Sequence, residues 1–402
     1  MRSSMGNKAS QLTGQVLYIH PAIRTYRREL FERLSKSGVD FFWSASPRRG
    51  EKGKSHSYTE INTILSETDI AYYQAKDTHR VSIDGLSFDL LKIPFWSHKI
   101  VVFSNIVSVP FLLLAPFVKL FGKQVVVFDE LWRYPKEIRK YRLLYQYVNF
   151  LTRYCVDRVV AAGTKARDFY IDEFDFPKDS IAVAYNTTVD SKQALSSEDK
   201  NSEVKRTLDS LSSNSKILYL GRVIKYKGLD VLIKAMKDVD VSHDLVVVGD
   251  GDDEYKKECL ALIQELDLES RVHFLGPCES SDAPYYYQHC DFFVLPTRFR
   301  LDANVQMESW GFTVNEAMAL EKPVIATEAV GSAYDLVVDG KTGYVAKAGD
   351  SESLARSVNL LIENNSDNVF GINARKLLLE KCNYSSNHQA YMRVFEELID
   401  AK

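Results

Sequence analysis

The sequence lacks paired cysteines, a long apolar run and an apolar N-terminus. Its five cysteines are odd in number, lie far apart and form no CxxC pair, which argues against a disulfide framework and a structural zinc site. The first residues, MRSSMGNKASQ, contain no apolar core of a signal peptide, so we expect neither a signal peptide nor a membrane anchor there. Both absences favour a cytoplasmic location.

The most apolar segment is Ile106–Val118 (IVSVPFLLLAPFV), which is too short to cross a bilayer and contains Pro110 and Pro116. We therefore exclude a transmembrane helix here and predict a buried helix of the first domain. An interfacial segment that dips into a membrane surface is the alternative.

A glycine-rich dinucleotide loop is missing as well. No GxGxxG motif follows a first strand with an acidic residue about twenty positions later. This absence makes a Rossmann dehydrogenase the least favoured enzyme class.

The composition is that of a folded chain with two domains. Its 402 residues are 45% hydrophobic and 26% charged, and this length exceeds one ordinary core. Residues 1–190 hold 27 Lys and Arg against 20 Asp and Glu, whereas residues 191–402 hold 24 against 34. A basic half suggests an anionic partner, either a membrane surface or a phosphorylated acceptor. The alternative is two solvated surfaces of unequal charge with no anionic partner.

Short β-rich apolar runs alternate with helical segments in both halves, a pattern typical of parallel sheets covered by helices. In the first half we predict strands at Gln15–His20, Asp40–Ser44, Lys99–Phe103, Gln124–Phe128 and Arg158–Ala162. In the second half we predict strands at Ile217–Gly221, Leu245–Gly249, Val272–Leu275, Phe292–Leu295, Pro323–Thr327 and Gly343–Ala346. Helices should lie between the strands, because Tyr26–Ser35 and Leu143–Tyr154 carry apolar residues at helical spacing.

These elements predict an α/β chain with two doubly wound units in series. The first spans residues 1–190 and the second residues 216–384, and the polar, serine-rich stretch 191–215 is predicted to link them. A C-terminal helix at about 385–402 is expected to pack back on the first unit. Ligands should bind at the carboxyl ends of the strands, facing a central cleft.

Two cations follow the first strand of the second unit. In ILYLGRVIKYKGLDVLIKAM, Arg222 lies just beyond the strand and Lys227 at the start of the next helix. A guanidinium fork and an ammonium at one strand end suit a diphosphate, whose charge grows as it becomes a leaving group. Taken alone, such cations are more often solvated surface charges.

A second element, PTRFRLDANVQMESWGFTVNEAMALEKPVIATEAVG, places Glu308 and Glu316 on either side of a turn at Gly311, with seven residues between them. With its aromatic glycine turn, its EAMA helix and its PVIAT strand, this element resembles the family 4 glycosyltransferases. The resemblance extends through most of the second half, in VVVGDGDD, RVHFLGP, CDFFVLPT and DGKTGYV. Five ordered motifs at the expected spacings rarely arise by chance.

The resemblance implies the GT-B fold, in which two Rossmann-like domains face a central cleft, with the acceptor in the N-terminal and the donor in the C-terminal domain. It implies retaining transfer of a hexosyl unit from a nucleotide-diphosphate sugar to a hydroxyl of a glycan or lipid-linked acceptor. Cell-surface polysaccharide or glycolipid assembly is the expected context. We expect no metal, no other cofactor and no nucleic acid partner, and a cytoplasmic protein that is at most peripheral on a membrane.

Carried over to this sequence, Glu316 resembles the family's glutamate that binds the ribose hydroxyls, and Glu308 the one beside the donor sugar. Backbone N–H groups at the helix start would face the diphosphate. The expected donor site comprises Arg222, Lys227, Glu308, Gly311, Phe312, Thr313, Val314 and Glu316, of which the first three are also expected to be catalytic. Two alternatives remain: Thr313 and Glu316 also fit a capping box that merely closes the helix, and Glu308 fits a solvated carboxylate.

The stretch Asp250–Gly251–Asp252–Asp253 imitates the metal-binding DxD motif of another glycosyltransferase class. We reject a metal here, because the family has a GDG turn in this place and glycine permits a tight connection after the strand Leu245–Gly249.

The first half matches the family less well, because YIHPAIRTYRRELF stands where relatives have a glycine-rich loop. Candidates for contact with the acceptor are His20, Arg24, Arg27, and, in FDELWRYPK, Glu130 and Trp132. Asp129 or Glu130 would have to replace the histidine that many relatives place near the transferred sugar, and so take the acceptor proton. Asp129 is equally suited to cap a helix, and the arginines to be solvated.

A nucleotide-sugar-binding module that keeps the donor fold without turnover is the main alternative to an enzyme. The missing glycine loop and histidine are its support.

Overall fold

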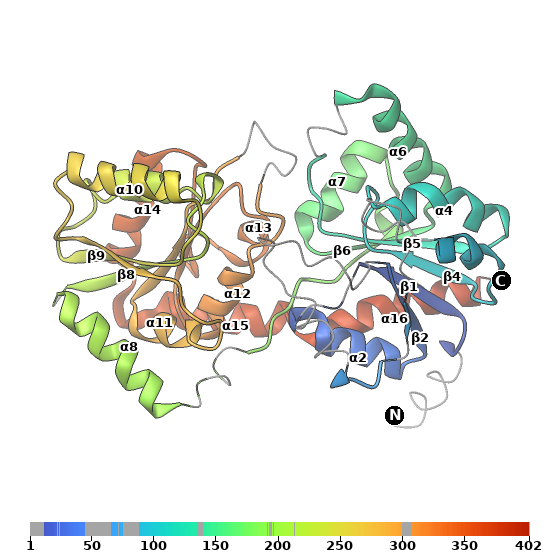
Figure 1. Ribbon diagram of the computed structural model, residues 1–402, viewed down its shortest axis with the longest axis horizontal. Coiled ribbons are helices and arrows are strands. Elements are labelled where there is room, and N and C mark those ends of the chain that lie inside the picture. Colours follow the sequence, from blue (N-terminus) through green and yellow to red (C-terminus); the bar gives the residue numbers. More distant parts are fainter. Residues whose placement is uncertain are drawn as a thin grey trace. The chain divides into compact units, whose positions relative to one another are not determined.

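The computed structural model describes residues 12–21, 23, 25–44, 66–70, 72–74, 88–134, 140–190, 192, 195, 197–212, 214–299 and 307–401. The chain forms two compact units (Figure 1). The first comprises Met1–Thr187 and Tyr384–Lys402, and the second Thr188–Asn383.

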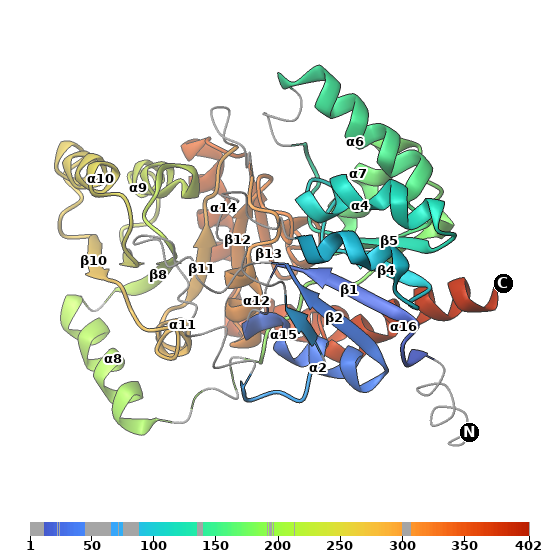
Figure 2. The ribbon, with the colours of Figure 1, turned by 45° about the vertical axis from the view of Figure 1, so that its right-hand side comes forward.

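The first unit is a parallel sheet in the order β3-β2-β1-β4-β5-β6-β7. Its strands are β1 (Val16–His20), β2 (Val39–Trp43), β3 (Tyr72–Gln74), β4 (Ile100–Phe103), β5 (Gln124–Asp129), β6 (Arg158–Ala161) and β7 (Ile181–Val183). One face is covered by α4 (Val109–Leu120), α6 (Arg142–Cys155) and α7 (Thr164–Phe174), and the other by α2 (Arg28–Lys36) and α16 (Tyr384–Asp400) (Figures 1 and 2). Two short 3-10 helices, η1 (Thr25–Arg27) and η2 (Phe88–Phe95), complete the part relevant to function.

The second unit repeats this design with a parallel sheet in the order β10-β9-β8-β11-β12-β13. Its strands are β8 (Ser215–Leu220), β9 (His243–Val248), β10 (Val272–Gly276), β11 (Phe292–Leu295), β12 (Val324–Thr327) and β13 (Gly343–Ala346). The helices are α8 (Glu198–Leu211), α9 (Leu229–Ala235), α10 (Asp253–Glu265), α11 (Ala283–His289), α12 (Phe312–Ala319), α13 (Ala333–Leu336), α14 (Ser351–Asn364) and α15 (Val369–Lys381), with a 3-10 turn η5 (Lys225–Lys227). Helices α9, α10 and α14 share one face and its core.

The predicted fold class, α/β with two Rossmann-like doubly wound units, is confirmed. Each predicted strand is present, with ends displaced by no more than two residues, because continuous Val, Ile, Leu and Phe runs suit strands buried on both faces. The strands β3 and β7 were not predicted, since three residues give too little periodicity.

The predicted linker 191–215 is wrong over most of its length. Its residues Glu198–Leu211 form helix α8, which begins at Ser197, whose side chain accepts a hydrogen bond from the Lys200 N–H. Val204 and Leu208, four residues apart, are buried and α8 packs on α11. Serine-rich composition concealed a capped amphipathic helix that belongs to the second unit.

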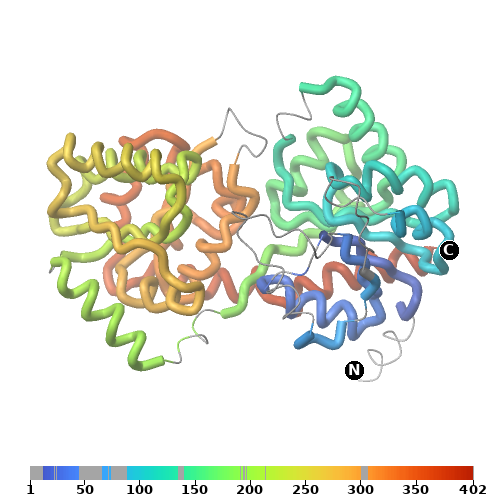
Figure 3. Tube along the Cα trace, in the orientation of Figure 1, coloured from blue at the N-terminus to red at the C-terminus, as the bar shows by residue number. Residues whose placement is uncertain are grey.

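The C-terminal helix α16 belongs to the first unit. It packs on α2, β6 and β7, and Figure 3 shows its red trace beside the blue trace of α2. Tyr391 and Phe395 are fully buried in the core on that face, and the Tyr391 hydroxyl lies 3.4 Å from the Tyr18 hydroxyl.

The apolar segment Ile106–Val118 contains most of helix α4, as predicted. Phe111, Leu114 and Val118 are buried against the sheet, and Ser108 caps the helix by accepting from the Phe111 N–H. No helix in the described part of the chain is both long and apolar enough to cross a membrane.

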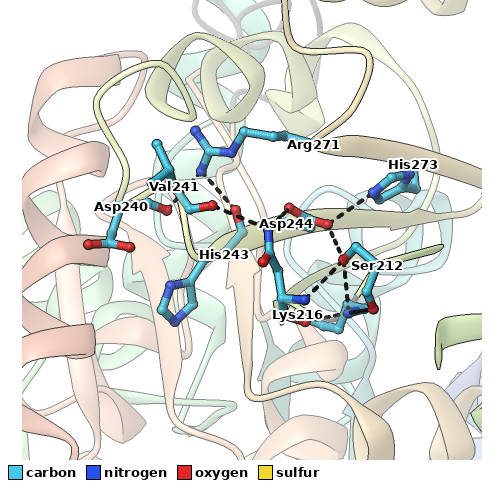
Figure 4. Close-up of polar contacts among 9 residues, drawn as sticks. Ser212, Lys216, Asp240, Val241, His243, Asp244, Arg271 and His273 are labelled. Atoms are coloured by element: carbon cyan, nitrogen blue, oxygen red, sulfur yellow. Dashed lines mark hydrogen bonds and ion pairs between the residues drawn. The ribbon is translucent and has the colours of Figure 1, made fainter. Parts of the chain in front are cut away.

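A buried polar network closes the amino-terminal edge of the second sheet (Figure 4). The Asp244 carboxylate accepts hydrogen bonds from Ser212, from Asn214 Nδ2 at 2.9 Å and from His273 Nε2 at 3.2 Å. Nearby, Arg271 donates to main-chain carbonyls, including that of His243 at 2.7 Å. This edge is opposite to the carboxyl ends of the strands, so the network serves the fold rather than a ligand.

Candidate functional site

The strand order of the second unit marks where a ligand should bind. The chain runs from β8 outward to β9 and β10, then returns to the other side of β8 as β11. The loops that follow β8 and β11 therefore diverge and leave a crevice at the carboxyl edge of the sheet. These two loops carry Arg222, Lys227 and Glu308.

Lys227 and Glu308 are brought together across this switch point. The Lys227 ammonium forms an ion pair with the Glu308 carboxylate, and the two side chains are only 12% and 20% exposed. Glu308 is held by main-chain bonds, since its N–H donates to the Ala329 carbonyl at 2.9 Å and its carbonyl accepts from the Gly331 N–H at 3.0 Å. The alternative of a solvated Glu308 carboxylate is therefore wrong.

Arg222 lies on the same loop but is exposed. Its guanidinium donates to the Tyr226 hydroxyl at 3.0 Å, and its carbonyl accepts from the Tyr219 hydroxyl at 2.7 Å. These bonds hold the loop so that Arg222 and Lys227 both lie at the carboxyl end of β8.

Helix α12 begins beside this ion pair, at Gly311. Gly311 has a φ of 93°, and a Cβ there would lie 2.9 Å from Val330 Cγ1. Only glycine fits this turn without strain. The N-cap residue is Gly311 and Thr313 is the second residue of the helix, so the capping-box alternative for Thr313 and Glu316 is wrong.

The start of α12 differs from the prediction in one backbone N–H group, that of Val314. The Val314 N–H donates to the Gly311 carbonyl at 3.0 Å, so it is already used within the turn. The Thr313 N–H remains a candidate for an anion at the positive end of the helix.

Glu316 lies one turn further along α12 and is partly buried. Its carboxylate accepts a hydrogen bond from the Tyr287 hydroxyl of α11 at 3.1 Å. Burial raises the pKa of Glu316 to about 7, and the Tyr287 hydrogen bond opposes this rise. Ligand hydroxyl groups that donate hydrogen bonds to this carboxylate would stabilise its charged form and so lower its pKa.

Arg298 was missed by the sequence analysis. It follows β11, its Nε donates to the Lys225 carbonyl at 2.7 Å, and its N–H donates to the Tyr226 carbonyl at 2.9 Å. Its guanidinium forms a fork with the Asp230 carboxylate at 3.1 and 3.2 Å. Arg298 thereby fixes the turn that carries Lys227. A cation three residues beyond the buried strand β11 was the available signal.

The Asp250–Asp253 stretch forms a turn in which the Asp250 and Asp252 carboxylates have protein partners. Asp252 caps α10 by accepting from the Tyr255 N–H at 2.9 Å, and Asp250 pairs with Lys256 at 3.1 Å. Gly249 allows a close approach, since a Cβ there would lie 1.9 Å from the Gly221 carbonyl oxygen.

In the first unit, Arg27 and Glu130 also meet at the carboxyl edge of the sheet. Arg27 is buried, forms an ion pair with Glu130, and lies 4.3 Å from the Phe128 ring centroid. Asn186 joins them, because its Nδ2 donates to Glu130 at 3.1 Å. The alternative of a solvated arginine is wrong for Arg27, while Arg24 lies outside the described residues.

Asp129 is 1% exposed and bound on both oxygens. It accepts from the Leu131 N–H at 2.9 Å, the Tyr170 hydroxyl at 2.7 Å and the Ile106 N–H at 3.3 Å. Burial raises its pKa to about 7, although these donors oppose the rise. Asp129 is therefore held in the core at the end of β5 and bonds to a loop N–H rather than capping a helix, while its assignment as the acceptor's base stays a prediction. Glu130, 28% exposed, is the carboxylate at this edge that solvent reaches.

The other two candidates of the first unit are partly removed from solvent. His20 is buried among aromatic rings, with its centroid 5.1 Å from that of Phe31 and 6.3 Å from that of Trp43. Trp132 packs partly on the core, with the Lys165 ammonium 6.0 Å from its ring centroid.

The second unit is similar to known glycosyltransferases. Residues 201–377 match the family model of the glycosyl transferases group 1. An uncharacterized glycosyltransferase of Methanocaldococcus jannaschii, MJ1069, is 26% identical over 61% of this chain and 59% of its own length. The capsular polysaccharide biosynthesis glycosyltransferase CapM of Staphylococcus aureus is 32% identical over 42% of this chain and 43% of its own length. The chain thus matches about half the length of these curated relatives.

Solved structures extend the likeness to the fold of the whole chain. Anabaena HepE in complex with UDP superimposes with a TM-score of 0.73 at 19% identity, over 95% of this chain and 100% of that one. Sucrose-phosphate synthase of Thermosynechococcus elongatus gives a TM-score of 0.70 at 17% identity, over 96% and 100%. The chain therefore has the GT-B fold, and its second unit carries the sequence pattern of the glycosyl transferases group 1.

Proposed function

We propose that the protein is a retaining, metal-independent glycosyltransferase that moves a hexosyl unit from a nucleotide-diphosphate sugar to a hydroxyl of a glycan or lipid-linked acceptor. The observation that carries the proposal is the Lys227–Glu308 ion pair at the switch point, beside the glycine turn that begins α12. Cation, carboxylate and helix start converge where a doubly wound sheet binds nucleotides.

The departing diphosphate is the group that these residues serve. Lys227 and Arg222 supply fixed positive charge at the end of β8, and the Thr313 N–H adds the helix dipole. Charge grows on the bridging oxygen as the sugar leaves, so these contacts stabilise the transition state more than the ground state.

Donor binding exchanges partners at the ion pair. Lys227 leaves Glu308 for the diphosphate, and the Glu308 carboxylate becomes available to hydroxyls of the sugar. Glu316 accepts from the ribose hydroxyls. The acceptor hydroxyl attacks on the face from which the diphosphate departs, so no covalent nucleophile is required.

The first unit is proposed to take the acceptor, with Arg27, Glu130 and Asn186 at the carboxyl edge of its sheet. Among similar proteins, CapM is named for capsular polysaccharide biosynthesis, and a Mycobacterium leprae relative is a phosphatidyl-myo-inositol mannosyltransferase. We therefore place the reaction in cell-surface polysaccharide or glycolipid assembly, at the cytoplasmic face of a membrane.

A panel of UDP-, GDP- and ADP-sugars, read by thermal shift and by hydrolysis with and without acceptor, tests the proposal. UDP-glucose is the first choice, because HepE was solved with it. A stabilising nucleotide sugar that is also cleaved supports an enzyme. Stabilisation without any cleavage would favour the binding module instead, and a shift with NAD(P) alone would favour the dehydrogenase.

A further inference from the structure

Helix α4 has two apolar stripes, although only one faces the sheet. Phe111, Leu114 and Val118 are buried in the core. On the opposite side, Phe117 is half exposed and Leu120 is 79% exposed. A helix at the surface of a soluble unit normally carries polar residues on its outer side.

Helix α6 repeats this feature. Its outward residues Leu143, Tyr147, Phe150 and Tyr154 follow one another at spacings of four, three and four residues. All four are exposed, Leu143 to 82%. This spacing places them along one side of the helix, away from the buried Leu151.

The two stripes form one continuous surface, which we call the aromatic face. The Tyr147 hydroxyl donates to the Leu112 carbonyl of α4 at 2.8 Å, which ties α6 to α4. At the other end of α4, the ring centroid of Phe121 lies 4.7 Å from that of Phe95 in η2, which is 71% exposed. Figures 1 and 2 both show α4 and α6 on the same side of the first sheet.

The charged residues near the aromatic face indicate what kind of partner it binds. Residues 88–154 hold ten Lys and Arg but only four Asp and Glu. Asp129 is buried, Asp89 pairs with Lys92, and Arg142 is exposed directly beside Leu143. Lys119 and Arg153 are paired with Asp157 and Asp175, whereas Lys140 and Arg142 are exposed at the start of α6. Exposed aromatic and aliphatic side chains with such cations beside them match a layer of anionic headgroups over acyl chains.

We propose that the aromatic face of η2, α4 and α6 binds the surface of an anionic lipid bilayer. The proposal goes beyond the transfer reaction and stands without it, because the face contains none of the residues assigned to the donor. The segment Ile106–Val118 then combines its two predicted alternatives, because α4 is buried on one side and available to lipid on the other.

Vesicle co-sedimentation of the full chain tests this inference. The wild type should bind vesicles of phosphatidylcholine with phosphatidylglycerol more tightly than phosphatidylcholine alone, and rising salt should weaken the binding. The triple variant Leu120→Ser, Leu143→Ser, Tyr154→Ser should lower the partition onto the anionic vesicles by more than about tenfold. All three side chains are exposed, so the triple variant should still fold. As a separate variant, Arg142→Glu should also weaken binding to the anionic vesicles.

A matched triple variant on α15 provides the control. Val369→Ser, Ile372→Ser and Leu379→Ser remove three exposed apolar side chains from the second unit. This control should bind vesicles as the wild type does. Hydrolysis of a nucleotide sugar in the absence of lipid should be the same in all three proteins, so failure here is distinct from failure of the proposed function.

Several results would overturn the inference. The inference is wrong if the wild type does not bind anionic vesicles. It is also wrong if both triple variants lose vesicle binding to the same extent. If the wild type were a dimer that the aromatic-face variant converts to a monomer without any change in vesicle binding, the face would be a contact between two copies instead.

Discussion

Lys227 and Glu308 form an ion pair, and the neutral variant Lys227→Gln should show how much Lys227 contributes to catalysis. Loss of one charge-assisted contact to the diphosphate is expected to lower kcat/KM by about 100-fold, or roughly 3 kcal/mol of transition-state stabilisation. The free energy of unfolding should fall as well, because the Glu308 carboxylate is only 20% exposed and loses its partner. Steady-state kinetics with the donor found in the panel, together with calorimetry, provides the measurement.

Lys225→Gln is the matched control, since Lys225 lies on the same turn but pairs with Glu258 and is 71% exposed. It should keep wild-type kinetics. Equal losses in Lys225→Gln and Lys227→Gln would mean that general positive potential acts here rather than a specific contact.

Glu316 should make donor binding depend on pH. Its pKa is raised to about 7 by burial, so ribose hydroxyls meet a carboxylate above this pH and a neutral acid below it. Affinity for the nucleotide sugar should fall below pH 7, by up to about tenfold per pH unit. Isothermal titration with the nucleotide sugar, whose diphosphate does not ionise in this range, isolates the protein's contribution.

The same pKa has the opposite effect on the free protein. Because the folded value is raised, the folded state binds more protons than the unfolded one between about pH 4.5 and 7, so this group's stabilising contribution falls as pH rises through 7. Glu316→Gln should remove both pH dependences at once. A variant that retained the pH-dependent affinity would exclude Glu316 as its origin.

At the scale of elements, the turn between β8 and α9 depends on a residue outside it. Arg298 binds the Lys225 carbonyl and forms a fork with Asp230, so Arg298→Ala should release the turn and displace Lys227. We expect about a tenfold loss of kcat/KM, because displacement of a cation by a fraction of an ångström weakens transition-state contacts. Arg298→Lys keeps the charge but not the fork, so it should be impaired as well. Wild-type kinetics in Arg298→Lys would show that charge alone suffices.

At the opposite edge of the same sheet, Asp244 should matter for stability and not for activity. Asp244→Ala removes an acceptor that Ser212, Asn214 and His273 share in a fully buried position (Figure 4). Leaving these donors unsatisfied should cost about 2–4 kcal/mol in the free energy of unfolding. Chemical denaturation measures this, and kcat of the folded fraction should be unchanged. Loss of kcat in a protein of normal stability would contradict a structural role.

Helices and strands were predicted better where consecutive residues are buried than where buried residues are separated by exposed ones. Strands such as Phe292–Leu295 are recognisable because four apolar residues are buried on both faces. Helix α8 has only Val204 and Leu208 buried, so its polar residues resemble a linker. The motif also located Glu308 and Lys227, but not their ion pair, because residues 81 positions apart meet only through the sheet order. The burial of Asp129 was not predicted either, because its partners Tyr170 and Ile106 are distant in sequence and no local pattern reveals them.

At the scale of the whole molecule, the C-terminal helix α16 returns to the first unit and supplies part of its core. The two units therefore have separate cores, and each should have its own unfolding transition that a core substitution lowers selectively. Phe395→Ala removes a fully buried ring of α16 and should destabilise the first unit by about 3–5 kcal/mol.

Phe370→Ala is the counterpart in the second unit, where Phe370 packs 5.9 Å from the ring centroid of Tyr344. It should lower the second transition alone, and a bound nucleotide sugar should raise that same transition, since its proposed contacts lie in the second unit. Differential scanning calorimetry of both variants, with and without the donor, distinguishes the two. If Phe395→Ala lowered the ligand-sensitive transition as much as Phe370→Ala does, the units would unfold as one, and the last nineteen residues would be coupled to the donor site rather than confined to the first unit.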